Sequence, residues 1–299
     1  MTSLKRQNGL ILVKLFALLS IVRWLNILLT IIAQYLAAVF VLNPTKSYVE
    51  ILSNPKLHLM TLASAFIIAG GYIINNFYDL EKDLINRPDK TLFGRVVSRQ
   101  FCLNCYFLFN TIGLVLALLA SWRIFLFYLF FAIALWAYSH KFQKISFLRE
   151  ITASILSVTS FFSIGIFYKY ITIPLFLYGC FAMLIIFSRE IIKGIEAYKG
   201  NAIFGYGTLA TSLGKTKSAY IILIMHLLAF VPLLLLWLRY HLSFLGILLC
   251  SINLLLIAFV YLRLYKKFDD ENASTIHTFY KLFIVFIIFL VVLIPAQVL

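Results

Sequence analysis

The spacing of its apolar runs is the feature that most constrains what this chain can fold into. A helix needs about 20 apolar residues to cross roughly 30 Å of hydrocarbon, and 63% of the 299 residues are hydrophobic whereas 12% are charged. This composition excludes a soluble globular protein. Nine runs are long enough to span a membrane: 22–42, 57–79, 101–121, 123–139, 148–168, 171–188, 217–238, 243–262 and 279–298. We therefore expect an all-α, multi-pass integral membrane protein with nine transmembrane helices.

Residues 8–20 are also apolar, but they contain Lys14 and lead directly into Arg23. We expect an interfacial helix there, lying on the membrane before the first span. A cleavable signal peptide is the alternative interpretation of this segment. The lack of an A-x-A-like site before a full span argues against it.

The basic residues are divided unequally between alternate loops. One set of loops holds 21 of the 26 lysines and arginines, and the other set holds the remaining five: Lys46, Lys56, Arg123, Lys169 and Arg239. Since cytoplasmic loops are enriched in Lys and Arg, this predicts a cytoplasmic N-terminus and a C-terminus outside. Most of the net charge of +15 then lies on one membrane face, where it attracts anionic headgroups or an anionic substrate rather than nucleic acid.

No Gly/Ser-rich linker or soluble module interrupts the spans, so residues 1–299 are interpreted as a single domain. Two connections, 80–100 and 189–216, are long, rich in charge and expected on the cytoplasmic face. Functional residues concentrate in such loops. We expect the active site at these two segments.

The stretch NNFYDLEKDLINRPDK, residues 75–90, contains four of the eleven acids of the chain. Asn75, Asp79 and Asp83 are spaced four residues apart and cover only about 80° of a helix face. Mg²⁺ prefers one or two carboxylates together with water and substrate phosphates, and the basic residues that follow can contact phosphate oxygens. The stretch therefore predicts a metal-diphosphate site, with a solvated helix end as the alternative. These basic residues are Arg87, Lys90, Arg95 and Arg99.

NNFYDLEKDLINRPDK resembles the first Asp-rich motif of the UbiA-type intramembrane prenyltransferases, N-x-x-x-D-x-x-x-D followed by N-R-P. Three further stretches extend the resemblance over about residues 15–215: IVRWLNILL with Arg23 and Asn26, YSHKFQK with Tyr138, Lys141 and Lys144, and REIIKGIEAYKGNAIFGYGTLATSLG at 189–214. The last stretch is most similar to the branch that includes the geranylgeranylglycerol-phosphate geranylgeranyltransferases.

The resemblance implies an all-helical fold with nine spans and a prenyltransferase activity. Such an enzyme transfers a polyprenyl group from a prenyl diphosphate to a lipid-like or aromatic acceptor within the membrane, with Mg²⁺ as cofactor. It implies Asn75, Asp79 and Asp83 as the catalytic metal-binding residues. It also implies a multi-pass protein of the cell inner membrane, in contact with membrane lipids. The residues expected to bind the diphosphate are Arg23, Arg87, Lys90, Lys141, Lys144 and Lys193.

The second acidic cluster of the family is altered in this chain. Its aspartate positions fall on Gly194, Ala197 and Asn201, and Arg149 and Glu150 stand where the family more often has Gly-Asn. Glu190, Glu196 and Asn201 are the candidate additional metal ligands. A single metal assisted by lysines is the other arrangement that this pattern allows.

Two other functions are compatible with this pattern. Since the three aspartates are missing, a protein of the same fold with lost or altered catalysis could bind a polyprenyl lipid. A transporter is the third class, and the position of the acids at one membrane face rather than at the midplane argues against it.

Overall fold

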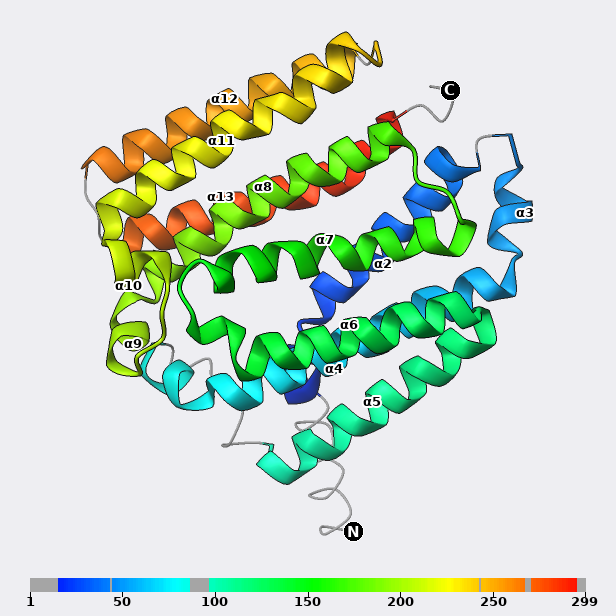
Figure 1. Ribbon diagram of the computed structural model, residues 1–299, viewed down its shortest axis with the longest axis horizontal. Helices are drawn as coiled ribbons and strands as arrows, with labels where there is room; N and C mark the ends of the chain where they lie inside the picture. The colour runs from blue at the N-terminus through cyan, green and yellow to red at the C-terminus, as the bar shows by residue number, and fades with distance from the viewer. Residues whose placement is uncertain (1–15, 44, 87–96, 242, 267–269, 295–299) are drawn as a thin grey trace, which may run out of the picture. The chain divides into compact units, whose positions relative to one another are not determined.

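The computed structural model describes residues 16–43, 45–86, 97–241, 243–266 and 270–294, and the elements in this part of the chain are helices (Figure 1). Their bounds are α2 Trp24–Leu36, η1 Ala37–Leu42, α3 Tyr48–Leu52, α4 Pro55–Asn86, α5 Arg99–Ala120, α6 Trp122–His140, η3 Phe142–Lys144, α7 Leu148–Tyr168, α8 Ile173–Glu196, α9 Tyr198–Ile203, α10 Leu209–Leu213, α11 Lys215–Leu238, α12 Ser243–Lys266, α13 Asp270–Leu290 and η4 Val291–Leu293.

Nine helices within the described residues are long and apolar enough to cross a membrane, which confirms the predicted all-α fold with nine spans. They are Trp24–Leu42, Pro55–Glu81, Arg99–Ala120, Trp122–Lys144, Leu148–Tyr168, Ile173–Glu196, Lys215–Leu238, Phe244–Arg263 and Glu271–Leu293. The sixth span was expected to end at 188, but its helix continues to Glu196. Of the expected interfacial helix 8–20, residues 16–20 are helical and the rest lies outside the described residues. The membrane face of each terminus stays a prediction.

Side-chain caps and proline explain where several helices begin. The hydroxyls of Ser98 and Thr172 accept hydrogen bonds from backbone N–H groups in the first turns of α5 and α8. Pro55 opens α4, where its missing N–H leaves no intrahelical bond unmade. At the end of α7, Lys169 takes the left-handed conformation that terminates many helices.

Two compact units are present. Unit 1 comprises Met1–Ile31 and Pro55–His140, and in it α4 packs along both α5 and α6. Gly113 of α5 permits a close approach, because a Cβ at this position would lie 2.8 Å from the side chain of Ile67 and 3.3 Å from the carbonyl oxygen of Ala63. Small residues at such contacts are typical of membrane helices. The prediction of a single domain remains untested.

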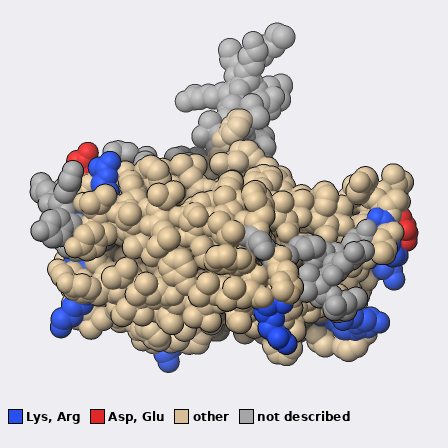
Figure 2. Space-filling view, turned by 90° about the horizontal axis from the view of Figure 1, so that it is seen from above, with Lys and Arg blue, Asp and Glu red and all other residues tan. Residues whose placement is uncertain are grey.

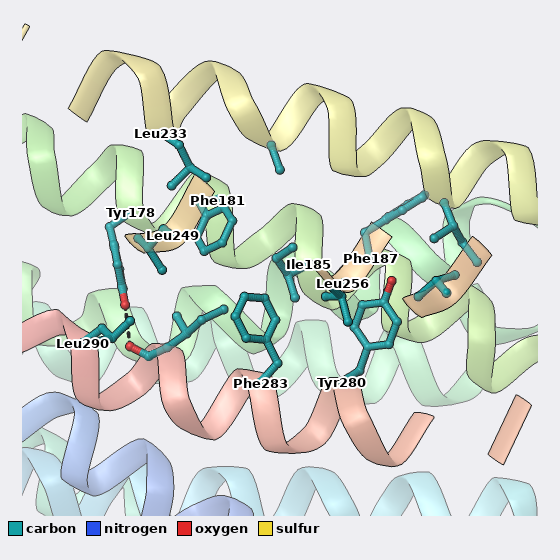
Figure 3. Close-up of a cluster of buried hydrophobic side chains, with 14 of the residues drawn as sticks. Tyr178, Phe181, Ile185, Phe187, Leu233, Leu249, Leu256, Tyr280, Phe283 and Leu290 are labelled. Carbon is teal, nitrogen blue, oxygen red and sulfur yellow. Dashed lines mark hydrogen bonds between the residues drawn. The ribbon is translucent and has the colours of Figure 1, made fainter. Parts of the chain in front are cut away.

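Unit 2 comprises Ile32–Asn54 and Lys141–Leu299. Helix α8 packs against α7, α11 and α13, and α11 packs against α12. Figure 3 shows Phe181 and Ile185 of α8 pointing towards Phe283 of α13. The Tyr178 hydroxyl donates a hydrogen bond to the backbone carbonyl of Ile287, so α8 and α13 are joined by a polar contact as well as by apolar packing.

A polar network lies buried among α11, α12 and α13 of unit 2. The His226 ring nitrogens Nδ1 and Nε2 each lie 2.6 Å from a partner, the side-chain oxygen of Asn253 and the Tyr280 hydroxyl respectively. Asn253 Nδ2 also donates to the backbone carbonyl of His226 at 3.1 Å. Buried polar groups satisfied in this way tie neighbouring membrane helices together.

The outer surface is mainly apolar, whereas that of a soluble protein is rich in polar and charged side chains. Large apolar side chains are exposed along the spans, among them Phe107, Leu118, Phe130, Leu227 and Leu255. The face in Figure 2 is almost entirely uncharged, and Lys and Arg lie at its margins. This is the surface expected of a protein whose spans contact lipid.

Candidate functional site

The first polar cluster lies on α4 in unit 1. Asn75 and Asp79 are one turn apart on the same helix face, Asn75 half-buried and Asp79 with 8% of its surface exposed. Asp83 lies one turn further along α4, and its side chain is outside the described residues. The backbone thus arranges these three residues as predicted. Their binding of metal remains a prediction.

The segment before α2 packs on the same part of α4. Asn76 Nδ2 donates to the backbone carbonyl of Ile21 at 3.3 Å and to that of Tyr72 at 2.7 Å. The Arg23 guanidinium lies over the Tyr72 ring, 5.2 Å from its centroid, and Asn26 Nδ2 donates to the Tyr72 hydroxyl at 3.1 Å. Because positions 72 and 75 are neighbours on a helix surface, Arg23 is held near Asn75.

An aromatic group adjoins Asp79 along α4. The ring of Tyr78 meets that of His140 edge to face at 5.3 Å, and His140 stacks on Trp136 at 5.3 Å. Tyr72 and Tyr78 were not among the predicted site residues. Their position on the motif helix is visible in the sequence, but their contacts with Arg23 and His140 are not.

Of the basic residues predicted for the diphosphate, Arg87 and Lys90 lie outside the described residues. Lys141 and Lys144 are exposed, at η3 in unit 2. Lys144 Nζ lies 5.8 Å from the centroid of the Tyr206 ring. The Gly207 N–H donates to the Lys144 carbonyl at 2.8 Å, so the segment between α9 and α10 is fixed against η3.

The second charged cluster lies at the end of α8. Glu190 is buried, and its two carboxylate oxygens accept hydrogen bonds from Arg189 Nη1 at 2.9 Å and from Lys193 Nζ at 3.1 Å. Glu190 and Lys193 are three residues apart, a spacing that places them side by side on a helix. The predicted ligand Glu190 and the predicted diphosphate-binding Lys193 therefore contact each other.

The other two candidate ligands have different surroundings. Glu196 Oε2 lies 2.7 Å from His277 Nδ1 of α13, so this carboxylate contacts a neighbouring helix. Asn201 of α9 is completely buried, and neither polar atom of its side chain has a hydrogen-bond partner among the described residues. An amide in this state is one that a ligand could satisfy.

Glu150, the third residue of α7, is a buried acid that was not among the predicted site residues. Its side chain is 0% exposed, and Oε1 accepts a hydrogen bond of 3.0 Å from the backbone N–H of Leu209, the first residue of α10. The contact joins residues 59 apart in the chain, and the sequence signalled it only as a departure from the Gly-Asn of the family.

Acidic and metal-binding side chains are sparse in the part of the chain whose side chains are described. No group of three His, Cys, Asp or Glu that could hold a metal occurs among the residues whose side chains are described. The donors present are carboxylate and amide oxygens on the face of α4 and at the end of α8. Such a sparse set of hard oxygen donors fits Mg²⁺, which keeps water and phosphate oxygens as ligands.

The profile of the UbiA prenyltransferase family matches residues 27–289. Digeranylgeranylglyceryl phosphate synthase from Pyrococcus horikoshii is 30% identical over 181 residues. This match covers 60% of the present chain and 65% of the relative, slightly less than two thirds of its length.

Solved structures of related fold cover nearly the whole chain. A structure from work on digeranylgeranylglyceryl phosphate synthase in membranes has a TM-score of 0.70 and 25% identity, and covers 96% of this chain and 99% of the other. The structure of a UbiA homolog from Archaeoglobus fulgidus bound to GPP and Mg²⁺ has a TM-score of 0.69 and 16% identity, and covers 92% and 99% of the two chains.

Proposed function

Because the chain belongs to the UbiA prenyltransferase family, we propose that it transfers a polyprenyl group from a prenyl diphosphate to a lipid-like acceptor within the membrane, with Mg²⁺. The observation that carries this proposal is the pairing of Asn75 with the nearly buried Asp79 on one face of a membrane-spanning helix. Ionisable side chains within spans are costly, and they usually serve a function.

The residues around Asp79 suit a diphosphate. Asn75, Asp79 and Asp83 would hold Mg²⁺, which when bound neutralises negative charge on the departing diphosphate. Arg23, held over Tyr72, supplies a permanent positive charge with several N–H donors for phosphate oxygens.

The names of the relatives guide the choice of acceptor. A digeranylgeranylglyceryl phosphate carries two geranylgeranyl groups, so a glyceryl phosphate that already bears one is the first acceptor to test. Geranylgeranyl diphosphate is the matching donor. We place the reaction in the cell inner membrane, on the face that carries the excess of Lys and Arg.

The test is release of diphosphate by the purified protein, given geranylgeranyl diphosphate and geranylgeranylglyceryl phosphate with and without Mg²⁺. Asp79→Asn keeps the size of the side chain and removes its charge, and we expect a loss of activity of about 10²-fold or more. The matched control is Glu81→Gln, two residues further along α4, where the side chain is exposed beside Arg99.

We expect the control variant to retain wild-type activity. Two results together would refute an enzymatic function. The wild type would show no Mg²⁺-dependent turnover with any acceptor, and the Asp79→Asn variant would still bind lipid. Retained lipid binding of that kind would favour a non-catalytic polyprenyl-binding protein of the same fold.

A further inference from the structure

Only one of the two carboxylate oxygens of Glu150 has a hydrogen-bond partner among the described residues. Oε1 accepts the Leu209 N–H, whereas Oε2 is buried and has no hydrogen-bond partner among the described residues. Burial of a charged oxygen without a partner is strongly unfavourable, and buried polar atoms are nearly always paired. The open oxygen therefore requires a cation or a proton.

The surroundings of Glu150 distinguish it from the other buried acid of unit 2. Glu190 uses both oxygens internally, on Arg189 and Lys193. Arg149 and Glu190 are among the charged groups that interact electrostatically with Glu150. Glu150 thus adds a second carboxylate to this cluster, and it is the one with an oxygen left for a ligand.

The carboxylate also faces a position without a side chain. A Cβ built on Gly194 of α8 would lie 3.9 Å from Glu150 Oε1 and 3.5 Å from the Cβ of Thr208. Position 194 is one at which the resemblance to the family leads us to expect aspartate. The Glu150 carboxylate, from α7, lies beside position 194 of α8. Because Gly194 has no side chain, there is room for this carboxylate.

We propose that Glu150 is a Mg²⁺ ligand of unit 2, supplied by α7 in place of the acid that α8 lacks at position 194. The proposal rests on the proposed function, because the metal would serve a diphosphate or phosphate substrate. Asn201 of α9 is also buried, and its side-chain oxygen has no hydrogen-bond partner among the described residues.

The experiment uses the purified full chain, Mn²⁺ as a paramagnetic substitute for Mg²⁺, and inorganic pyrophosphate as the anion. Glu150→Gln retains an oxygen that can accept the Leu209 N–H and removes the charge. We expect the apparent Kd for Mn²⁺ in the presence of pyrophosphate to rise about tenfold or more, while the metal-free thermal midpoint stays at or above that of the wild type, because a buried charge without a partner has been removed. Glu50→Gln, at an exposed ion pair with Lys46 in unit 2, is the control and should bind Mn²⁺ as the wild type does.

Wild-type Mn²⁺ affinity in Glu150→Gln would overturn the proposal and leave Glu150 as a protonated cap of α10. If the Gln variant fails to fold, Glu150→Asp tests the proposal instead. Asp keeps the negative charge, but its side chain is shorter by one methylene group, so the carboxylate no longer reaches the same position. Weakened Mn²⁺ binding in that variant supports the proposal, and unchanged binding overturns it.

These measurements need no turnover, so they are separable from the test of the proposed function. A wild-type protein that releases no diphosphate would refute the function, and the Mn²⁺ titration would still decide the role of Glu150. If Asp79→Asn abolishes turnover while Glu150→Gln binds Mn²⁺ as the wild type does, the proposed function stands and the metal-binding role of Glu150 is refuted.

Discussion

At the scale of single residues, the surroundings of each acid decide what it can do. Glu190 and Glu150 have the same side chain and are both buried in unit 2. Glu190 lies between two cations, whereas Glu150 has one oxygen on a backbone N–H and one without a donor among the described residues. Glu190 is held by ion pairs at the end of α8, whereas Glu150 is the acid that we propose as a metal ligand.

Gly194→Asp tests this assignment directly. The new carboxylate would lie close to Glu150, and burial of a further polar group without a partner should lower the free energy of unfolding of the metal-free protein by about 1–3 kcal/mol. Gly194→Ala should be tolerated, because the nearest atom to its Cβ would be 3.5 Å away. The measurement is thermal unfolding in detergent with EDTA.

Gly194→Asn is the uncharged control of the same size. Adding Glu150→Gln to Gly194→Asp should recover most of the lost stability, since the pair then carries one carboxylate instead of two and Gln keeps an oxygen that can accept the Leu209 N–H. Equal stability of the Asp and Asn variants at position 194 would mean that the two carboxylates do not meet.

The sequence was sufficient to predict that Asn75, Asp79 and Asp83 share one helix face, because a spacing of four residues fixes this without knowledge of any neighbour. It was not sufficient for Glu150, whose partner Leu209 is 59 residues away. It also did not reveal that Glu190 is enclosed by Arg189 and Lys193, or that Glu196 contacts His277 of α13. Local periodicity carries no information about which helices pack together.

At the scale of elements, the number of spans was predicted correctly and most of their ends to within a few residues, because apolar length determines which segments can cross a bilayer. The two largest differences are the end of α8, expected at 188 and found at Glu196, and the start of α13, expected at 279 and found at Asp270. The charges at 189, 190 and 193 satisfy one another on the helix surface, so they do not end it. Part of the expected loop 189–216 is therefore helical, and it continues into the short helices α9 and α10.

The polar network of α11, α12 and α13 should stabilise unit 2. His226→Phe leaves the side chains of Asn253 and Tyr280 without their imidazole partner, and we expect a loss of about 1–3 kcal/mol in the free energy of unfolding. Tyr280→Phe removes a hydroxyl that contacts both His226 and Ser188, and it should also cost about 1–3 kcal/mol because a buried imidazole nitrogen loses its partner. Reversible unfolding in a denaturing detergent measures both changes.

Leu227→Phe is the matched control, because this neighbour of His226 is 55% exposed on the lipid-facing side of α11. It introduces the same aromatic ring without touching the network, so stability should stay within about 0.5 kcal/mol of the wild type. A His226→Phe protein as stable as this control would show that the three helices do not depend on the network.

At the scale of the whole molecule, the distribution of charge predicts orientation. The nine helices found in the described part of the chain divide the loops into two alternating sets, and 21 of the 26 basic residues fall in one set. Long-range attraction of Lys and Arg to the cytoplasmic leaflet is the physical reason for the bias. The helices alone do not reveal which end of each span faces the cytoplasm.

Labelling of introduced cysteines in intact cells tests this orientation. Lys46→Cys and Tyr170→Cys lie in loops expected outside, and Lys199→Cys and Lys217→Cys lie in segments expected on the cytoplasmic face; all four native side chains are exposed. The native cysteines lie within spans, so a membrane-impermeant thiol reagent should react weakly with the unmodified protein. We expect positions 46 and 170 to be labelled in intact cells, and positions 199 and 217 only after permeabilisation.

The reverse pattern would place the acids of α4 and the charged end of α8 on the outer face, where a cytoplasmic prenyl diphosphate could not reach them. Labelling of all four positions from one side would contradict the alternation that nine spans require.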